Sequence, residues 1–162
     1  MVQIDKAQFG HRKYHRRRVV QGHWVLGIIA DGSDDLRLEL CPGNVRSAET
    51  LIRLIRRHVA PGSTIRTDQW RAYRGLSEYG YSHQTVNHSR EFVTADGVHT
   101  NRIESMWRPM REFFEGRHIG DEEFAAHVVE YVWRRHCSNV CVDTLEGILV
   151  FIRQTFSVHR PT

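Results

Sequence analysis

The sequence predicts an α/β domain built on a mixed five-stranded sheet, and three observations support this prediction. Apolar residues alternate with polar ones over the N-terminal third, which is the period of strands. Further along, they recur every three or four residues, as in helices, with two short alternating segments in between. The length of 162 residues and the hydrophobic fraction of 40% suit a single globular domain with a buried core.

Three strands are predicted at the N-terminal end. Residues 2–5 alternate between apolar and polar, the pattern of a strand with one buried face. Residues 24–29 are apolar on both faces and predict a central strand. Asp31 and Gly32 form a hairpin signal, and the alternating segment 36–40 follows it. The short turns between these strands predict an antiparallel meander.

Helices and two more strands follow. Ser47 is a plausible N-cap for a helix over residues 48–59, which Pro61 and Gly62 end. The remaining pattern predicts a strand over 63–68, a short helix over 70–76, a strand over 81–86, a helix over 103–114 and two C-terminal helices, over 124–132 and 145–152. The order βββ-α-β-α-β-α, with extra C-terminal helices, is that of the ribonuclease H-like fold.

The charge composition indicates a polyanionic partner. Lys and Arg total 23 against 19 Asp and Glu, a net charge of +4, and all the basic residues except Lys6 and Lys13 are Arg. The planar guanidinium fork of Arg binds phosphates in a bidentate manner. Three Cys are too few for a disulfide framework, and no apolar run approaches the roughly 18 residues of a membrane span. We therefore expect no membrane partner.

Three acidic residues stand at predicted element ends. Asp5 lies in the first strand, Asp68 ends the fourth, and Glu104 begins the helix over 103–114 on its polar side. In the predicted fold the first and fourth strands are neighbours and this helix packs beside them, so the three carboxylates are expected to converge. Phosphodiester chemistry uses such clusters to hold two divalent ions about 4 Å apart. Mg²⁺ and similar hard ions prefer carboxylate oxygens.

Each carboxylate also has a plainer interpretation. Asp5 could end a strand at a turn. Asp68 could cap the short helix that begins near Trp70, because Asp is a favoured N-cap residue. Glu104 precedes Arg108 by four residues, the favourable order for an ion pair on a helix surface.

Three segments carry a family resemblance. Residues 2–29 (VQIDKAQFGHRKYHRRRVVQGHWVLGII), 46–89 (beginning RSAETLIRLIRRHVAPG) and 98–108 (VHTNRIESMWR) resemble the ISXO-type DDE transposases. These are bacterial insertion-sequence enzymes related to the eukaryotic Merlin elements. The resemblance covers most of residues 2–136. It implies a ribonuclease H-like catalytic domain over 1–136 that cuts and joins DNA ends with Mg²⁺ or Mn²⁺ in a two-ion site. Residues 137–162 are then a helical extension packed on the same domain.

The resemblance also implies roles for particular residues. The family's two Asp and one Glu fall on Asp5, Asp68 and Glu104, which are the expected catalytic and metal-binding residues. The family's Asn falls on Asn101, which shares a helix face with Glu104 and could orient a ligand, bind metal or touch DNA. DNA, as transposon ends or sites derived from them, is the implied partner, and assembly as a homo-oligomer is expected.

Predicted DNA contacts lie in three places, namely the basic block, the residues beside Trp70 and the helix that carries Glu104. The basic block over 11–18, HRKYHRRR, resembles the family's basic hairpin and would clamp phosphates in a salt-dependent manner. Trp70 could stack on a base, as could Tyr73, or either could belong to the core. The full predicted set is Arg12, Lys13, Arg16, Arg17, Arg18, Trp70, Arg71, Arg102 and Arg108. The basic block also resembles a nuclear localisation signal, so we expect the nucleus in a eukaryote and the cytoplasm in a bacterium.

Three departures from the family pattern keep alternatives open. Lys6 stands where the family has Glu, Pro109 falls inside the predicted helix after Glu104 and is expected to kink it, and the chain begins at the first strand, without the usual N-terminal DNA-recognition region. One alternative is a catalytically decayed or domesticated DNA-binding protein derived from such a transposase. Another is a nuclease acting on RNA or on hybrids. A third is an interaction module that uses the C-terminal helices.

Overall fold

The computed structural model describes residues 1–10, 22–86, 100–115, 117, 119 and 122–156. The basic block therefore lies outside the described residues, and with it five of the predicted DNA contacts, namely Arg12, Lys13, Arg16, Arg17 and Arg18. The chain divides into two compact units, Met1–Ile119 and Gly120–Thr162. The predicted boundary after residue 136, and the packing of the extension on the domain, stay predictions.

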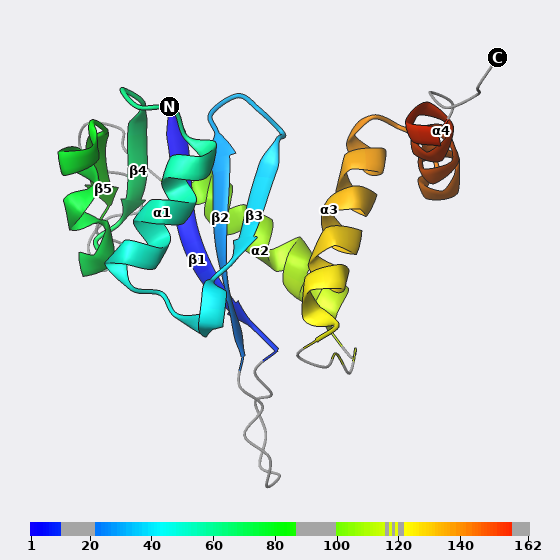
Figure 1. Ribbon diagram of the computed structural model, residues 1–162, viewed down its shortest axis with the longest axis horizontal. Helices are drawn as coiled ribbons and strands as arrows, with labels where there is room; N and C mark the ends of the chain where they lie inside the picture. Colours follow the sequence, from blue (N-terminus) through cyan, green and yellow to red (C-terminus); the bar gives the residue numbers. More distant parts are fainter. Residues whose placement is uncertain (11–21, 87–99, 116, 118, 120–121, 157–162) are drawn as a thin grey trace, which may run out of the picture. The chain divides into compact units, whose positions relative to one another are not determined.

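The first unit is built on one mixed five-stranded sheet, which confirms the predicted α/β class (Figure 1). Its strands are β1 (Val2–Phe9), β2 (His23–Ala30), β3 (Leu36–Leu40), β4 (Thr64–Asp68) and β5 (Ser82–Val86). They lie in the order β3-β2-β1-β4-β5. β1, β2 and β3 pair antiparallel, as the short turns predict, whereas β4 is parallel to β1 and β5 is parallel to β4. β1 is therefore the central strand, with β4 beside it.

One face of the sheet packs on α1 (Ala48–His58) and on the 3-10 helix η2 (Arg71–Tyr79). The Ser47 side chain caps α1 as expected, because its Oγ accepts the backbone N–H of Thr50 at 3.2 Å. The core between these layers joins apolar side chains of β1, β2 and β4 with those of α1 and η2. Its fully buried members include Ile4, Leu26, Leu51, Leu54, Ile55, Ile65, Tyr73 and Leu76.

The other face of the sheet carries α2 (Asn101–Phe114) (Figure 1). Gln3 of β1 joins the two elements, since its Oε1 accepts the backbone N–H groups of Arg102 at 3.2 Å and Ile103 at 3.3 Å. Its Nε2 donates to Asp31 Oδ1 at 2.7 Å, so the amide is held at both ends. α2 continues through Pro109 to Phe114, and that proline does not end the helix.

Close contact of α2 with the sheet depends on Gly27 in β2, the residue paired with Asp5 of β1. A Cβ atom at Gly27 would lie 2.6 Å from Trp107 Cη2 and 2.9 Å from Ile103 Cδ1. Both side chains are buried. The missing side chain of Gly27 therefore makes room for the buried face of α2.

The second unit contains α3 (Phe124–Asn139) and α4 (Thr144–Phe156), in agreement with the two predicted C-terminal helices. Asp143 caps α4, because its Oδ1 accepts the backbone N–H groups of Leu145 at 2.9 Å and Glu146 at 3.2 Å. The rings of Trp133 and Phe151 meet edge to face with centroids 6.3 Å apart. Over the described residues, every helix is too short or too polar to cross a membrane.

We expect Gly27→Ala to lower the free energy of unfolding by about 1–3 kcal/mol, because the new methyl group overpacks the interface with α2. Gly75→Ala is the matched control, since a Cβ there would lie 3.5 Å from Ile52 Cδ1, an ordinary contact. Urea denaturation of both variants measures the difference. Equal stabilities for the two variants would show that α2 does not need the glycine.

Candidate functional site

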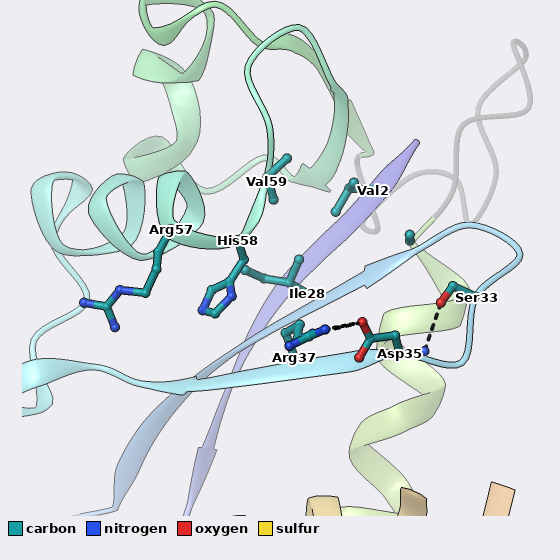
Figure 2. A pocket seen from close by; sticks show the side chains of 9 residues that line it. Val2, Ile28, Ser33, Asp35, Arg37, Arg57, His58 and Val59 are labelled. Carbon is teal, nitrogen blue, oxygen red and sulfur yellow. Dashed lines mark hydrogen bonds and ion pairs between the residues drawn. The ribbon is translucent and has the colours of Figure 1, made fainter. Parts of the chain in front are cut away.

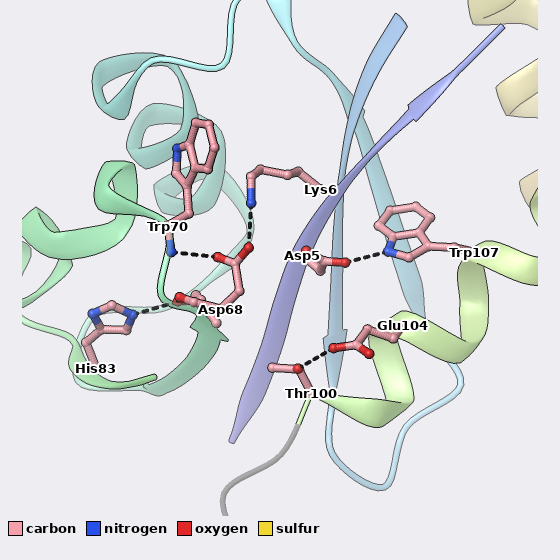
Figure 3. Close-up of polar contacts among 9 residues, drawn as sticks. Asp5, Lys6, Asp68, Trp70, His83, Thr100, Glu104 and Trp107 are labelled. Atoms are coloured by element: carbon pink, nitrogen blue, oxygen red, sulfur yellow. Dashed lines mark hydrogen bonds and ion pairs between the residues drawn. The ribbon is translucent and has the colours of Figure 1, made fainter. Parts of the chain in front are cut away.

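The three predicted carboxylates lie around the central strand (Figure 3). Asp5 belongs to β1 and Asp68 is the last residue of β4. Val2 pairs with Ile65 in the parallel ladder, and the same register carried three residues further sets Asp5 across from Asp68. Glu104 comes from the first turn of α2, which packs against β1. The structure thus brings together β1, the end of β4 and the first turn of α2, the three elements on which the sequence places these carboxylates.

Asp5 is held by the buried ring of Trp107. The indole Nε1 donates to Asp5 Oδ2 at 2.7 Å. Burial raises the pKa of Asp5 above its ordinary value, and the nearby Asp68 carboxylate raises it a little further. The hydrogen bond from Trp107 and the Lys6 charge oppose this shift without cancelling it. Trp107 belongs to the buried core, and no local pattern in the sequence indicates its contact with Asp5.

Asp68 has a cation on one oxygen and a backbone N–H on the other. Lys6 Nζ lies 2.7 Å from Asp68 Oδ2, and the lysine side chain is only 6% exposed. Asp68 Oδ1 accepts the backbone N–H of Trp70 at 3.0 Å. The interpretation of Asp68 as a helix cap is wrong, because the N-cap of η2 is Trp70, with no side-chain capping hydrogen bond. The Asp68 carboxylate instead closes the turn that precedes η2, and this contact coexists with the ion pair.

Glu104 is oriented by the residue that precedes α2. Thr100 Oγ1 donates to Glu104 Oε1 at 2.7 Å, and Thr100 is itself buried. Arg108, the predicted surface partner of Glu104, has its Nε 2.9 Å from Glu112 Oε1. Asn101 is the first residue of α2 and is exposed, one turn before Glu104.

The carboxylate oxygens of Asp5, Asp68 and Glu104 can be compared with the ligands that Mg²⁺ or Mn²⁺ requires. Carboxylate oxygens are the right chemical type for such ions. Nevertheless, in the described ranges no three His, Cys, Asp or Glu side chains are grouped so as to hold a metal ion. Asp68 already has Lys6 as its cation. The residues thus fit divalent ions by type, but the arrangement does not fit a two-ion site that includes Asp68 while Lys6 stays paired. The two-ion site stays a prediction.

Four of the predicted DNA contacts fall on described residues. Arg71 is exposed at the start of η2, and Arg108 is exposed on α2. The Arg102 guanidinium contacts the backbone carbonyl of Ser33 and lies 2.9 Å from Asp34 Oδ1, so it braces α2 against the β2–β3 turn. The fourth residue, Trp70, is half-buried against the core.

The sequence patterns did not predict that the Arg46 guanidinium stacks on two indole rings. Arg46 Cζ lies 3.9 Å from the ring centre of Trp24 and 4.1 Å from that of Trp70. In the described part of the chain the guanidinium has no hydrogen bond and no ion pair. No periodicity could have shown this cluster, because its three residues come from β2, the segment before α1 and the turn after β4.

A pocket lies apart from the carboxylates, between the end of α1 and the sheet (Figure 2). Its cationic side chains are already paired. Arg37 contacts Asp35 at 2.6 Å, while Arg57 and His58 both contact Glu39. None of the three predicted catalytic carboxylates lines this pocket, so we do not place the candidate site there.

Comparison with known proteins agrees with the resemblance found in the sequence. The family model of the ISXO2-like transposase domain matches residues 1–136. An uncharacterized transposase-like protein of Haemophilus influenzae is 34% identical over 100 residues, which are 60% of this chain and 78% of that protein. The matched range contains the whole sheet, α1, α2 and all three carboxylates.

We expect Asp5→Asn to stabilise the protein at neutral pH and to change little at acid pH. Because the folded-state pKa of Asp5 lies above 3.8, the protonated form favours folding, and this contribution is lost as the pH rises through the folded-state pKa. Asn resembles the protonated form and keeps an oxygen for Trp107. Urea denaturation from about pH 4 to about pH 8 in chelator-treated buffer measures the difference.

Asp35→Asn is the control for this pH series, because the Asp35 side chain is 58% exposed and ion-paired at the surface. The explanation by burial is contradicted if the stability gain of Asp5→Asn over wild type does not grow with pH.

Proposed function

This chain belongs to the ISXO2-like transposase domain family, and on that premise we propose that it binds DNA and cleaves and transfers DNA strands. The element order and the mixed sheet support a ribonuclease H-like catalytic fold. Its DNA substrate would be transposon ends or sites derived from them. Assembly as a homo-oligomer is part of the same proposal.

The observation that carries this proposal is the gathering of Asp5, Asp68 and Glu104 around β1 (Figure 3). Once Lys6 leaves Asp68, these three side chains would hold Mg²⁺ or Mn²⁺ through their carboxylate oxygens. When bound, such ions activate the attacking oxygen and stabilise the leaving oxygen of a phosphodiester. Hydrogen bonds from Trp107 and Thr100 hold Asp5 and Glu104 in fixed orientations, which reduces the entropy lost when a ligand binds.

DNA would reach the site along a surface that contains Arg46. Its guanidinium is kept in place by the Trp24 and Trp70 rings, so little side-chain entropy remains to be lost on binding. Since no carboxylate in the described residues neutralises it, its N–H groups suit a phosphate. Trp70 follows Asp68 by two residues, so this cation lies close to the proposed reaction centre.

A second candidate function is DNA binding without cleavage, in a protein descended from such a transposase. The ion pair between Lys6 and Asp68 favours it, because a carboxylate that is neutralised by an ammonium attracts a metal ion less strongly. The two functions share the DNA surface and differ in the chemistry at Asp68.

Nicking of supercoiled plasmid in the presence of Mn²⁺ separates the two functions. The cleaving function predicts nicking by the wild type and a loss of at least about 100-fold in Asp68→Asn and in Glu104→Gln, equivalent to roughly 3 kcal/mol of transition-state stabilisation. Asp35→Asn, an exposed acidic residue outside the site, is the control and should nick normally. Absence of nicking with DNA binding retained would favour the second candidate.

We expect Arg46→Ala to weaken DNA binding for any sequence and to reduce the salt dependence of binding by about one phosphate contact, or roughly 0.9 in the slope of log K against log salt. Arg37→Ala is the matched control, because the Arg37 guanidinium is paired with Asp35. Fluorescence anisotropy at several salt concentrations measures both slopes. Equal salt-dependence slopes for the two variants would show that Arg46 does not contact a DNA phosphate.

A further inference from the structure

The partly buried ion pair of Lys6 and Asp68 is unusual for a candidate cation-binding site. Lys6 follows Asp5 directly in β1, so alternation sends its side chain toward the opposite face of the sheet. Asp68 nevertheless lies within its reach, with Lys6 Nζ 2.7 Å from Asp68 Oδ2 (Figure 3). With the lysine side chain 6% exposed and that of Asp68 29% exposed, water screens this pair only partly.

Aromatic rings hold the ammonium from another side. Lys6 Nζ lies 4.7 Å from the ring centre of Trp70 and 5.3 Å from that of Tyr73. Tyr73 is fully buried, and burial raises the pKa of its hydroxyl, so the ring stays neutral. Both distances allow cation–π attraction between the rings and the ammonium. The ammonium is therefore bound to the protein by one carboxylate and two rings.

Asp68 meets donors on both of its oxygens. Oδ2 contacts the ammonium, and Oδ1 accepts the backbone N–H of Trp70. A divalent ion on Asp68 would sit about 2.0–2.6 Å from the oxygen it binds. At Oδ2 that ion would lie close to the ammonium, and the two positive charges would repel each other. A metal ion therefore binds Oδ2 less strongly while Lys6 stays paired, and displacing Lys6 leaves its ammonium without a carboxylate.

We infer that the Lys6 ammonium is a built-in competitor of the metal ion at Asp68. It keeps the Asp68 carboxylate neutralised and free of metal until Lys6 is displaced. The inference rests on the proposed function, since the metal in question is the one that strand cleavage would use. It goes further by assigning to one residue of this chain the control of metal affinity.

The test is a double-mutant cycle read out by Mn²⁺ binding rather than by activity. Isothermal titration calorimetry and the electron paramagnetic resonance of free Mn²⁺ give the affinity of the full chain. Four proteins are compared, namely the wild type, Lys6→Met, Asp68→Asn and the double variant. Met keeps an unbranched apolar chain under the Trp70 and Tyr73 rings, and Lys6→Gln serves as a second variant if Lys6→Met does not fold.

We expect Lys6→Met to bind Mn²⁺ at least about tenfold more tightly than the wild type, a difference of about 1.4 kcal/mol. The gain should vanish when Asp68→Asn is added, because the competition takes place at that carboxylate. A gain that persists in the double variant would reflect only the loss of a positive charge, and it would overturn the inference. Equal Mn²⁺ affinities of the wild type and Lys6→Met would also overturn the inference.

The inference and the proposed function fail in different ways. Tighter Mn²⁺ binding by Lys6→Met through Asp68, with no DNA nicking, supports the inference and rejects cleavage. Nicking by a wild type that binds Mn²⁺ as tightly as Lys6→Met supports cleavage and overturns the inference. Absence of Mn²⁺ binding in all four proteins overturns the inference and, with it, the metal dependence of the proposed function.

Discussion

The anchoring of α2 on β1 by the Gln3 side chain is the contact on which the candidate site depends. One buried amide oxygen accepts two backbone N–H groups from the first turn of α2, and the amide nitrogen donates to Asp31. The N–H groups of a first helical turn have no partner within their own helix, so a buried helix end needs acceptors from elsewhere. Gln3 supplies that acceptor and so fixes Glu104 and Trp107 beside Asp5.

The two faces of β1 have different chemistry because side chains alternate along a strand. Gln3 and Asp5 point toward α2, where polar contacts to Trp107 and to the helix backbone hold them. Ile4 and Lys6 point toward α1 and η2, where Ile4 enters the apolar core and Lys6 meets aromatic rings. Asp68, at the end of the neighbouring strand, joins the two environments by its ion pair with Lys6.

Cations and indole rings alternate beside Asp68. Trp70 has the Lys6 ammonium 4.7 Å and the Arg46 guanidinium 4.1 Å from its ring centre, and Arg46 also lies over Trp24. Such contacts hold positive charge in place at low entropic cost. The same small region therefore offers one cation that is neutralised by a carboxylate and one whose N–H groups remain open to a phosphate. Under the proposed function, the first cation bears on metal binding and the second on DNA binding.

The sequence by itself determined the element order, the mixed sheet, the cap at Ser47 and the family, because these depend on local periodicity and on contiguous motifs. It also placed Asp5 and Asp68 on adjacent strands. Only the tertiary structure decided which side chains contact the carboxylates. The partners of Asp5, Asp68 and Arg46 lie far from them along the chain, and no local pattern encodes such contacts. Strand alternation alone predicts that the Lys6 side chain points to the face of the sheet opposite Asp5. Because Asp68 is the last residue of β4, its carboxylate nevertheless reaches the Lys6 ammonium.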